Sequence, residues 1–211
     1  MADDYGKFIT LEGSEGVGKT TNIEFVCQFL ETNNVPFIRT REPGGTPLAE
    51  ALREAMLAVR EEEVSGMTEL LIVFAARTQH LEQVIRPALA LGQWVVCDRF
   101  TDASYAYQGY GRGLNLEHIT ALESWVQNGL QPDLTLLLDL APDVAEQRMQ
   151  ERTKDRMESE QREFYQRVRA GYLERAAEQA RFRIIDAQQS VDAVAAQIEN
   201  HITDLIRHWR G

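Results

Sequence analysis

The sequence contains little cysteine and no long hydrophobic run. Its two cysteines, Cys27 and Cys97, are too few for a disulfide scaffold and lack the spacing of metal ligands, which indicates a reducing compartment. No apolar run approaches the roughly 20 residues that a membrane-spanning helix needs. The acidic residues 1–4 do not resemble the basic start of a secretory signal. We therefore expect a cytoplasmic protein with no membrane segment.

Basic residues are also scarce. The chain has 22 Lys and Arg against 33 Asp and Glu, a formal net charge of -11, which argues against a nucleic acid polymer as the main partner. A single nucleotide is not excluded, because a phosphate site needs only a few local hydrogen-bond donors. Repeats, low-complexity stretches and Pro/Gly/Ser-rich linkers are absent from the sequence. Residues 1–211 are therefore expected to form one domain.

Short apolar runs alternate with longer helical patterns along the chain. Strands are predicted over residues 7–12, 36–40, 94–97, 134–138 and 182–185. Helices are predicted over residues 21–31, 48–59, 68–91, 116–126, 144–151, 161–180 and 191–209. Thr46 and Pro47 are suited to a helix start, and Pro87 is expected to kink or interrupt its helix. This alternation predicts an α/β fold, with a five-stranded parallel sheet covered by helices on both faces and ligands at the carboxyl ends of the strands.

A glycine-rich segment lies between the first predicted strand and the first predicted helix. It matches G-x-x-x-x-G-K-[ST] in full and consists of Gly13, Ser14, Glu15, Gly16, Val17, Gly18, Lys19 and Thr20. Its glycines let successive N–H groups point inward, and the helix from Thr21 onward adds its positive end. Lys19 is expected to reach the β- and γ-phosphates, and Thr20 to offer its hydroxyl to Mg²⁺. The segment predicts that the chain binds a nucleoside triphosphate.

Such a loop occurs in switch GTPases, motors, transporter ATPases and kinases of small molecules. The chain has no Asn-Lys-x-Asp for guanine, no Asp-x-x-Gly switch after a strand and no Leu-Ser-Gly-Gly signature of a transporter ATPase. Five further motifs stand in order along the chain: residues 41–46 (Arg-Glu-Pro-Gly-Gly-Thr), 74–77 (Phe-Ala-Ala-Arg), 97–100 (Cys-Asp-Arg-Phe), 107–113 (Tyr-Gln-Gly-Tyr-Gly-Arg-Gly) and 155–156 (Asp-Arg). If the chain is a kinase of small molecules, these motifs must supply the pocket that binds the phosphoryl acceptor.

With the phosphate loop, these motifs resemble those of the thymidylate kinase family over nearly the whole chain. The resemblance implies the fold of a P-loop nucleoside monophosphate kinase. It also implies reversible transfer of the γ-phosphoryl group of ATP to dTMP, giving dTDP, with Mg²⁺ as cofactor. A homodimer packed through helices is implied as well. Two alternatives stay open: a kinase for another nucleotide or deoxynucleoside, and a non-catalytic switch that binds ATP but no acceptor.

The resemblance implies nine contacts with dTMP: Glu15, Glu42, Pro43, Arg53, Phe74, Arg77, Arg99, Ser104 and Gln108. Arg99 and Arg53 are implied to hold the acceptor phosphate, a task suited to the planar fork of a guanidinium. Glu15 is implied to accept the 3′-hydroxyl of the sugar. The three arginines of the set, the third being Arg77, favour an acceptor that is already a monophosphate.

Four of these residues are implied to meet the thymine base. Phe74 and Arg77 lie about one helical turn apart and share a face, so that Phe74 either stacks on the ring or belongs to the core. In several relatives the stacking phenylalanine lies four positions before the arginine, where this chain has Val73. Arg77 is implied to bond the base or the phosphate. Ser104 and Gln108 are implied to read the base edge and its methyl group.

Metal and adenine contacts are implied at the ends of predicted strands. Asp98 is placed either to hold the water shell of Mg²⁺ or to cap a helix. Glu42 is implied to approach the metal or the acceptor phosphate, and its bond to Pro43 is a candidate cis peptide. The metal set is therefore Thr20, Asp98 and Glu42. The turn of Asp186 and Ala187 is implied to border the adenine.

The phosphate loop contains no arginine between Gly13 and Lys19, whereas some thymidylate kinases carry one there. We hypothesise that Arg148, Arg152 or Arg156, in a lid over about residues 148–158, neutralises the γ-phosphate instead. The alternative is a solvated helix that pairs these arginines with neighbouring acidic side chains. The candidate catalytic residues are Lys19, Glu15, Arg99, Arg148, Arg152 and Arg156.

Overall fold

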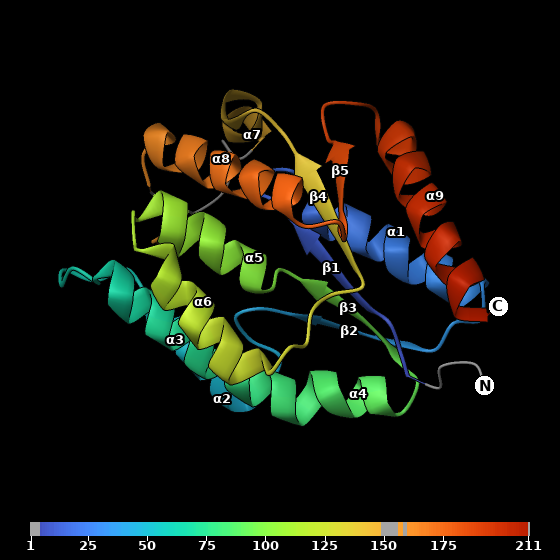
Figure 1. The fold of residues 1–211 in the computed structure, drawn as a ribbon. Helices are drawn as coiled ribbons and strands as arrows, with labels where there is room; N and C mark the ends of the chain where they lie inside the picture. The colour runs from blue at the N-terminus through green and yellow to red at the C-terminus, as the bar shows by residue number, and fades with distance from the viewer. Residues whose placement is uncertain (1–4, 149–155, 158–159, 211) are drawn as a thin grey trace.

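The computed structural model describes residues 5–148, 156–157 and 160–210 of the chain (Figure 1). In this part, one sheet contains the strands β1 (Phe8–Glu12), β2 (Phe37–Arg41), β3 (Trp94–Asp98), β4 (Leu134–Asp139) and β5 (Phe182–Asp186). They lie in the order β2-β3-β1-β4-β5, and every neighbouring pair is parallel. The predicted five-stranded parallel sheet is confirmed.

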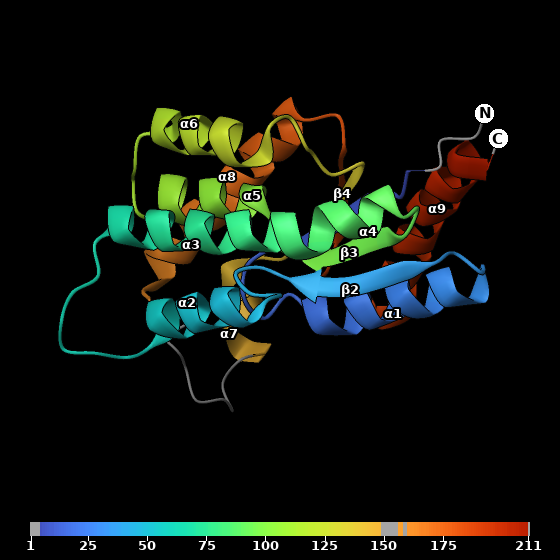
Figure 2. The same ribbon diagram turned by 90° about the horizontal axis from the view of Figure 1, so that it is seen from below.

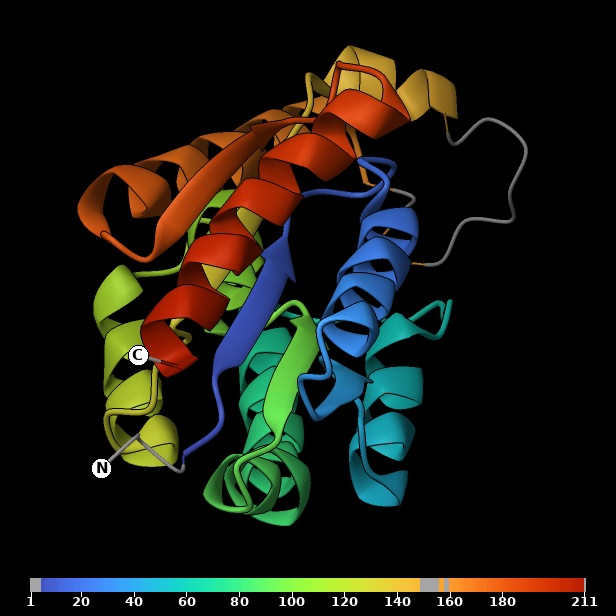
Figure 3. The same cartoon turned by 90° about the vertical axis from the view of Figure 1, so that its right-hand side faces the viewer.

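Helices cover both faces of this sheet, as predicted. They are α1 (Lys19–Thr32), α2 (Pro47–Leu57), α3 (Gly66–His80), α4 (Arg86–Ala90), α5 (Thr101–Ser104), α6 (Leu116–Gln127), α7 (Pro142–Arg148), α8 (Arg162–Glu178) and α9 (Val191–Arg210). Figure 3 shows α1 and α9 together in front of one face. Figure 2 shows α3 and α4 in line along the other side of β3. None of the described helices combines the length and the apolar character needed to cross a bilayer.

The alternation of side chains along the strands divides the core between the two faces. Ile9 and Leu11 of β1 belong to the cluster formed with α1 and α9, whereas Phe8 belongs to the cluster on the α4 side. All three are fully buried, and each such side chain contributes roughly 1.5–3 kcal/mol to folding. The rings of Trp94 in β3 and Trp209 in α9 meet edge to face, 5.5 Å apart. The sheet is therefore packed by a hydrophobic cluster on each face.

The predicted helix over residues 68–91 is interrupted. α3 ends at His80, a π-helical segment η1 (Leu81–Ile85) follows, and α4 begins with Pro87 in its first turn. The backbone stays helical from α3 into α4, and the π-helical turn just before Pro87 accommodates a residue that lacks an N–H and whose ring would clash in a regular α-helix. Thr46 caps α2 as predicted: its hydroxyl accepts a hydrogen bond of 3.2 Å from the Ala49 N–H.

The sequence patterns missed a helical segment after β3, made of α5 and the π-helical η2 (Tyr105–Gly111). This segment is rich in glycine and tyrosine and has no helical spacing of apolar residues. Its close packing against α8 explains its shape. A Cβ atom at Gly111 would lie 2.6 Å from the Phe164 ring, and one at Gly171 of α8 would lie 2.6 Å from the Tyr110 ring. Tertiary contact, rather than local pattern, therefore forms this segment.

The strand register brings the predicted motifs to one edge. Leu11 of β1 lies beside Asp98 of β3, and Arg41 of β2 lies beside Asp98 on its other side. The glycine-rich loop, the turn after β3 and the turn after β2 consequently leave the sheet side by side. This is the carboxyl edge, where open parallel sheets bind their ligands.

Candidate active site

The glycine-rich loop that joins β1 to α1 has the geometry of a phosphate site. Gly13 has φ 138°, and a Cβ atom there would lie 2.6 Å from the Leu138 carbonyl oxygen, so that only glycine fits. Lys19 is almost fully buried, and its Nζ donates to the carbonyl oxygens of Gly13 (3.2 Å) and Ser14 (2.8 Å). Burial, and next the charge of Arg99, lowers the pKa of Lys19. The ammonium is thus held inside the loop.

The first turn of α1 follows directly. Thr20 and Thr21 are exposed there, so both hydroxyls can reach a ligand on the loop. Gly18 precedes them in the left-handed conformation, with φ 89°. The N-terminus of α1 therefore adds its partial positive charge to that of Lys19 at one point. An anion of high charge fits this point.

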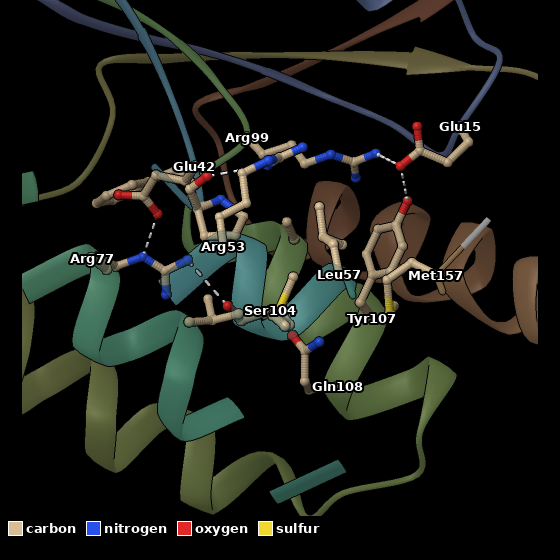
Figure 4. A pocket seen from close by; sticks show the side chains of 15 residues that line it. Glu15, Glu42, Arg53, Leu57, Arg77, Arg99, Ser104, Tyr107, Gln108 and Met157 are labelled. Atoms are coloured by element: carbon tan, nitrogen blue, oxygen red, sulfur yellow. Dashed lines mark hydrogen bonds and ion pairs between the residues drawn. The ribbon is translucent and has the colours of Figure 1, made fainter. Parts of the chain in front are cut away.

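A pocket lies beside the loop, between α2, α3 and η2 (Figure 4). Eight of the nine residues that the resemblance implied for the acceptor line it: Glu15, Glu42, Pro43, Arg53, Arg77, Arg99, Ser104 and Gln108. The structure therefore brings these eight together, although they come from five separate segments of the chain.

Two guanidinium groups stand at the end of the pocket nearest the loop. Arg99 has φ 68°, and its Nη2 donates to Glu15 Oε1 (2.5 Å). Its guanidinium also lies 4.8 Å from the centre of the Tyr107 ring. Arg53 donates to the Pro43 carbonyl oxygen (3.1 Å), and its pKa is lowered by burial and by the charges of Arg41 and Arg99. Two neighbouring positive charges, Arg53 and Arg99, favour the binding of an anion between them.

The opposite end of the pocket contains the buried guanidinium of Arg77. It lies between the rings of Phe74 (4.5 Å to the centroid) and Phe100 (5.2 Å). Its Nε donates to Glu42 Oε2 (2.6 Å) and its Nη2 to Ser104 Oγ (3.1 Å). Its Nη1 is buried and has no hydrogen-bond partner within the described residues. An unpaired buried donor is costly, so this group indicates a ligand acceptor.

Phe74 is the one predicted acceptor contact outside the pocket. It is buried in the core with Leu70, Tyr105 and Ile119, and the pocket wall is formed by Val73 instead. The stacking role proposed for Phe74 is therefore not supported, and its core role is. The shared face with Arg77 was predicted correctly, but on that face Phe74 packs beneath the guanidinium rather than into the pocket.

Glu42 is engaged by protein partners here, and its predicted role at the metal or the acceptor phosphate stays a prediction. Both of its carboxylate oxygens are engaged, one by Arg77 and the other by His80 Nδ1 (3.0 Å), and the side chain is buried. The Glu42–Pro43 bond is cis, as predicted. Asp98 differs: its Oδ1 is buried without a hydrogen-bond partner among the described residues. An orphaned carboxylate oxygen beside a phosphate loop suits a hydrated Mg²⁺.

Of the three predicted lid arginines, the structure describes Arg148 and Arg156, which contact different parts of the chain. Arg148 Nη2 donates to the carbonyl oxygen of Ala187 (3.2 Å), in the turn implied to border the adenine. The Asp186 carboxylate caps the same turn by accepting from the N–H of Gln188 (3.0 Å). Arg156 lies instead beside the acceptor pocket, where its Nη1 pairs with Glu69 Oε1 (2.7 Å). Arg152 lies outside the described residues.

Comparison with known proteins agrees with this geometry. A sequence profile described as Thymidylate kinase matches residues 11–198. A thymidylate kinase of Chromohalobacter salexigens is 54% identical over 208 residues, which cover 97% of this chain and 98% of that protein. A thymidylate kinase of Teredinibacter turnerae is 57% identical over 196 residues, which cover 92% and 96%.

The chain belongs to the thymidylate kinase family. The predicted family, fold class and dTMP kinase activity are thereby confirmed, and the alternatives of another kinase or a non-catalytic switch are not favoured. As in any thymidylate kinase, both substrates must meet at one point. Here the loop around Lys19 and the guanidinium of Arg99 meet at the carboxyl edge of β1 and β3.

Sequence reasoning missed the residues that support Arg99 in this thymidylate kinase. Glu12 is fully buried and accepts from the Phe100 N–H (2.7 Å) and from the Tyr172 hydroxyl (2.8 Å). The Tyr172 oxygen in turn accepts from Arg99 Nη1 (3.3 Å). Burial and the charge of Asp102 raise the pKa of Glu12 to about 8. For Glu12 the available signal in the sequence was a carboxylate at the end of an apolar strand. No local pattern links Tyr172 to it, because Tyr172 lies 160 residues from Glu12.

Proposed function

We propose that the acceptor dTMP binds in the pocket of Figure 4 with its phosphate toward the glycine-rich loop and its base toward Arg77. The observation that carries this orientation is the distribution of positive charge and unpaired donors. Arg53 and Arg99 stand at the loop end, and the unpartnered Nη1 of Arg77 lies at the far end. A monophosphate with a carbonyl-bearing base matches both ends.

The phosphate of dTMP would accept hydrogen bonds from Arg99 and Arg53. Glu15, beside Arg99, would accept the 3′-hydroxyl of the sugar. Its carboxylate already lies 3.5 Å from the Tyr107 hydroxyl, at the pocket wall. Arg77 Nη1 would donate to the O4 carbonyl of thymine, and Gln108 would face its N3–H. Each contact pairs a donor of one partner with an acceptor of the other.

ATP would bind with its phosphates in the loop of residues 13–20, its adenine near Asp186 and Ala187. Thr20 and Asp98 are the residues that would hold Mg²⁺ there; the orphaned Oδ1 of Asp98 supports this. A bound Mg²⁺ neutralises charge on the β- and γ-phosphates. Lys19 would stabilise the negative charge that develops on the transferring group.

Transfer needs no covalent intermediate with the protein. A phosphate oxygen of dTMP forms a bond to the γ-phosphorus as the bond to the β–γ bridging oxygen breaks, which yields dTDP and ADP. A monophosphate is already anionic, so no general base is required of the chain. The work of Lys19, Arg53 and Arg99 is to align the two substrates and offset their repulsion.

The lid also remains a proposal. Arg148 and Arg152 are the candidates to reach the γ-phosphate, because Arg148 lies at the Ala187 turn implied to border the adenine, whereas Arg156 is held beside the acceptor pocket by Glu69 and by the Met56 carbonyl oxygen (2.9 Å). The lid would lie over about residues 148–158, as part of a single kinase domain over residues 1–211. Water would be kept from the transferring group when it closes.

We propose that two copies of the chain pair through the neighbouring helices α2, α3 and α6. Each of them exposes a large apolar side chain: Leu48 is 55% exposed, Leu71 52% and Trp125 79%. Apolar groups gathered on adjacent helices commonly mark an interface. A location in the cytoplasm, where ATP is supplied and thiols such as that of Cys97 stay reduced, is proposed with it.

A coupled assay of ADP release tests the acceptor. With ATP and Mg²⁺, turnover is expected to be high with dTMP, lower with dUMP and close to background with dGMP, AMP or no acceptor. Adenine offers no carbonyl oxygen to the unpartnered Arg77 Nη1, and the two-ring purine of AMP or dGMP is larger than the pyrimidine ring of dTMP and dUMP. ADP release that does not depend on an acceptor would contradict the proposal and indicate an ATPase.

A further inference from the structure

A buried carboxylate stands behind the base end of the acceptor pocket. Glu69, in the first turn of α3, is fully buried and does not line the pocket. Its oxygens accept from Arg112 (Nη2, 2.9 Å; Nε, 3.1 Å) and from Arg156 (Nη1, 2.7 Å). Its Oε2 accepts a further hydrogen bond of 3.3 Å, from the side-chain amide of Gln108.

The contact with Gln108 fixes which way that amide points. A carboxylate held by two guanidinium groups offers only acceptors, so the amide must turn its NH₂ group toward Glu69. The amide oxygen is then left on the other side. Gln108 is a wall residue of the pocket, and Figure 4 shows its amide at the pocket floor below Ser104 and Tyr107. No hydrogen bond to Gln108 Oε1 occurs within the described residues.

We propose that Glu69 is a positioning residue that selects the base of the acceptor by holding the Gln108 amide with its oxygen toward the pocket. An oxygen there accepts a hydrogen bond from a ring N–H, as the N3–H of thymine or uracil supplies. The N3 atom of cytosine carries a lone pair instead, which an amide oxygen repels. Glu69 would thus exclude cytosine nucleotides without touching them. This inference rests on the proposed contact between Gln108 and the base.

Substitution of Glu69 by glutamine tests the proposal. A glutamine at position 69 presents either an oxygen or an NH₂ group, so Gln108 can turn over and offer its own NH₂ to the base. We expect the KM for dTMP to rise about tenfold. The preference for dTMP over dCMP, measured as the ratio of the dCMP inhibition constant to the dTMP KM, should fall by at least about tenfold. The dTMP:dUMP ratio should not change, because both bases carry N3–H.

Glu160 offers a matched control. It pairs with Arg112 Nη1 (2.6 Å) in the same cluster, and its contacts do not include Gln108. Glu160→Gln removes one negative charge from Arg112, one of the two arginines that Glu69 contacts, and both ratios are expected to stay within about twofold of the unsubstituted enzyme. Thermal unfolding of each variant verifies that it is folded. If Glu69→Gln does not fold, Glu69→Asp keeps the charge but withdraws the carboxylate from Gln108, and the same loss of preference is expected.

Gln108→Ala separates the two levels of the proposal. If it weakens dTMP binding and lowers the preference over dCMP, and Glu69→Gln adds nothing further to it, the inference is supported. If Gln108→Ala has this effect and neither Glu69 variant does, Glu69 has no positioning role and the inference alone is wrong. If Gln108→Ala leaves the KM and the preference unchanged, the proposed base contact is wrong and the inference falls with it.

Discussion

Replacing Lys19 with methionine is expected to lower kcat about 10³-fold. Methionine has nearly the length of lysine and no charge, and the ammonium lies inside the loop, on the carbonyl oxygens of Gly13 and Ser14. A preorganised charge aimed at the transferring group is worth about 10²–10³ or more in rate. The measurement is kcat with saturating ATP, Mg²⁺ and dTMP.

Stability provides the first control for this variant. Burial lowers the pKa of Lys19, which means that its charged form is disfavoured in the folded state at neutral pH. Methionine at this position should therefore unfold no earlier than lysine. A second control is Lys7→Met, since Lys7 precedes β1 at the other edge of the sheet and pairs with Asp133 (3.4 Å). A loss of kcat below tenfold in Lys19→Met would contradict the role of the loop.

Arg99→Met is expected to lower kcat/KM for dTMP by about 10³-fold or more, with part of the loss in KM. Arg99 is held in position by Glu15 and Tyr172, and its backbone adopts φ 68° at the turn after β3. No other guanidinium on that turn can replace it. Arginines that contact a phosphoryl group in transfer reactions contribute about 10³–10⁵ in rate.

Arg41→Met is the matched control for Arg99. Arg41 ends β2 at the same sheet edge, but it pairs with Glu50 (2.6 Å) and does not line the pocket. Substitution of Arg41 removes a positive charge near the site without removing a contact with the acceptor phosphate. We therefore expect kcat/KM to fall by less than about tenfold. Equal losses in the two variants would mean that general positive charge, rather than a direct contact of Arg99, serves the reaction.

The parts of the site that follow directly from a strand end were predictable from the sequence. Gly13, Asp98 and Glu42 each follow or end a short strand, and a parallel sheet brings such ends to one edge. The glycine-rich loop has a motif whose spacing carries its own chemistry. Local pattern and topology were sufficient to place these residues at one edge, and eight of the residues implied for the acceptor line one pocket.

The rest depends on contacts that no local pattern encodes. The direction of Phe74 is set by α6 and η2, which pack Tyr105 and Ile119 against it. The engagement of Glu42 by His80 joins two segments 38 residues apart. Tyr172, which supports Arg99, comes from α8 at the far end of the sequence. Motif spacing predicts which residues reach an edge, whereas tertiary packing decides what each side chain then contacts.

The most direct test of the account compares dTMP with thymidine as acceptor. The pocket places Arg53 and Arg99 where an acceptor phosphate would lie, and it offers no role for a free 5′-hydroxyl. We therefore predict that kcat/KM for dTMP exceeds that for thymidine by at least about 10³-fold, since thymidine leaves both guanidinium groups without their anion. Comparable use of the two acceptors would contradict the assignment of this pocket to a nucleoside monophosphate.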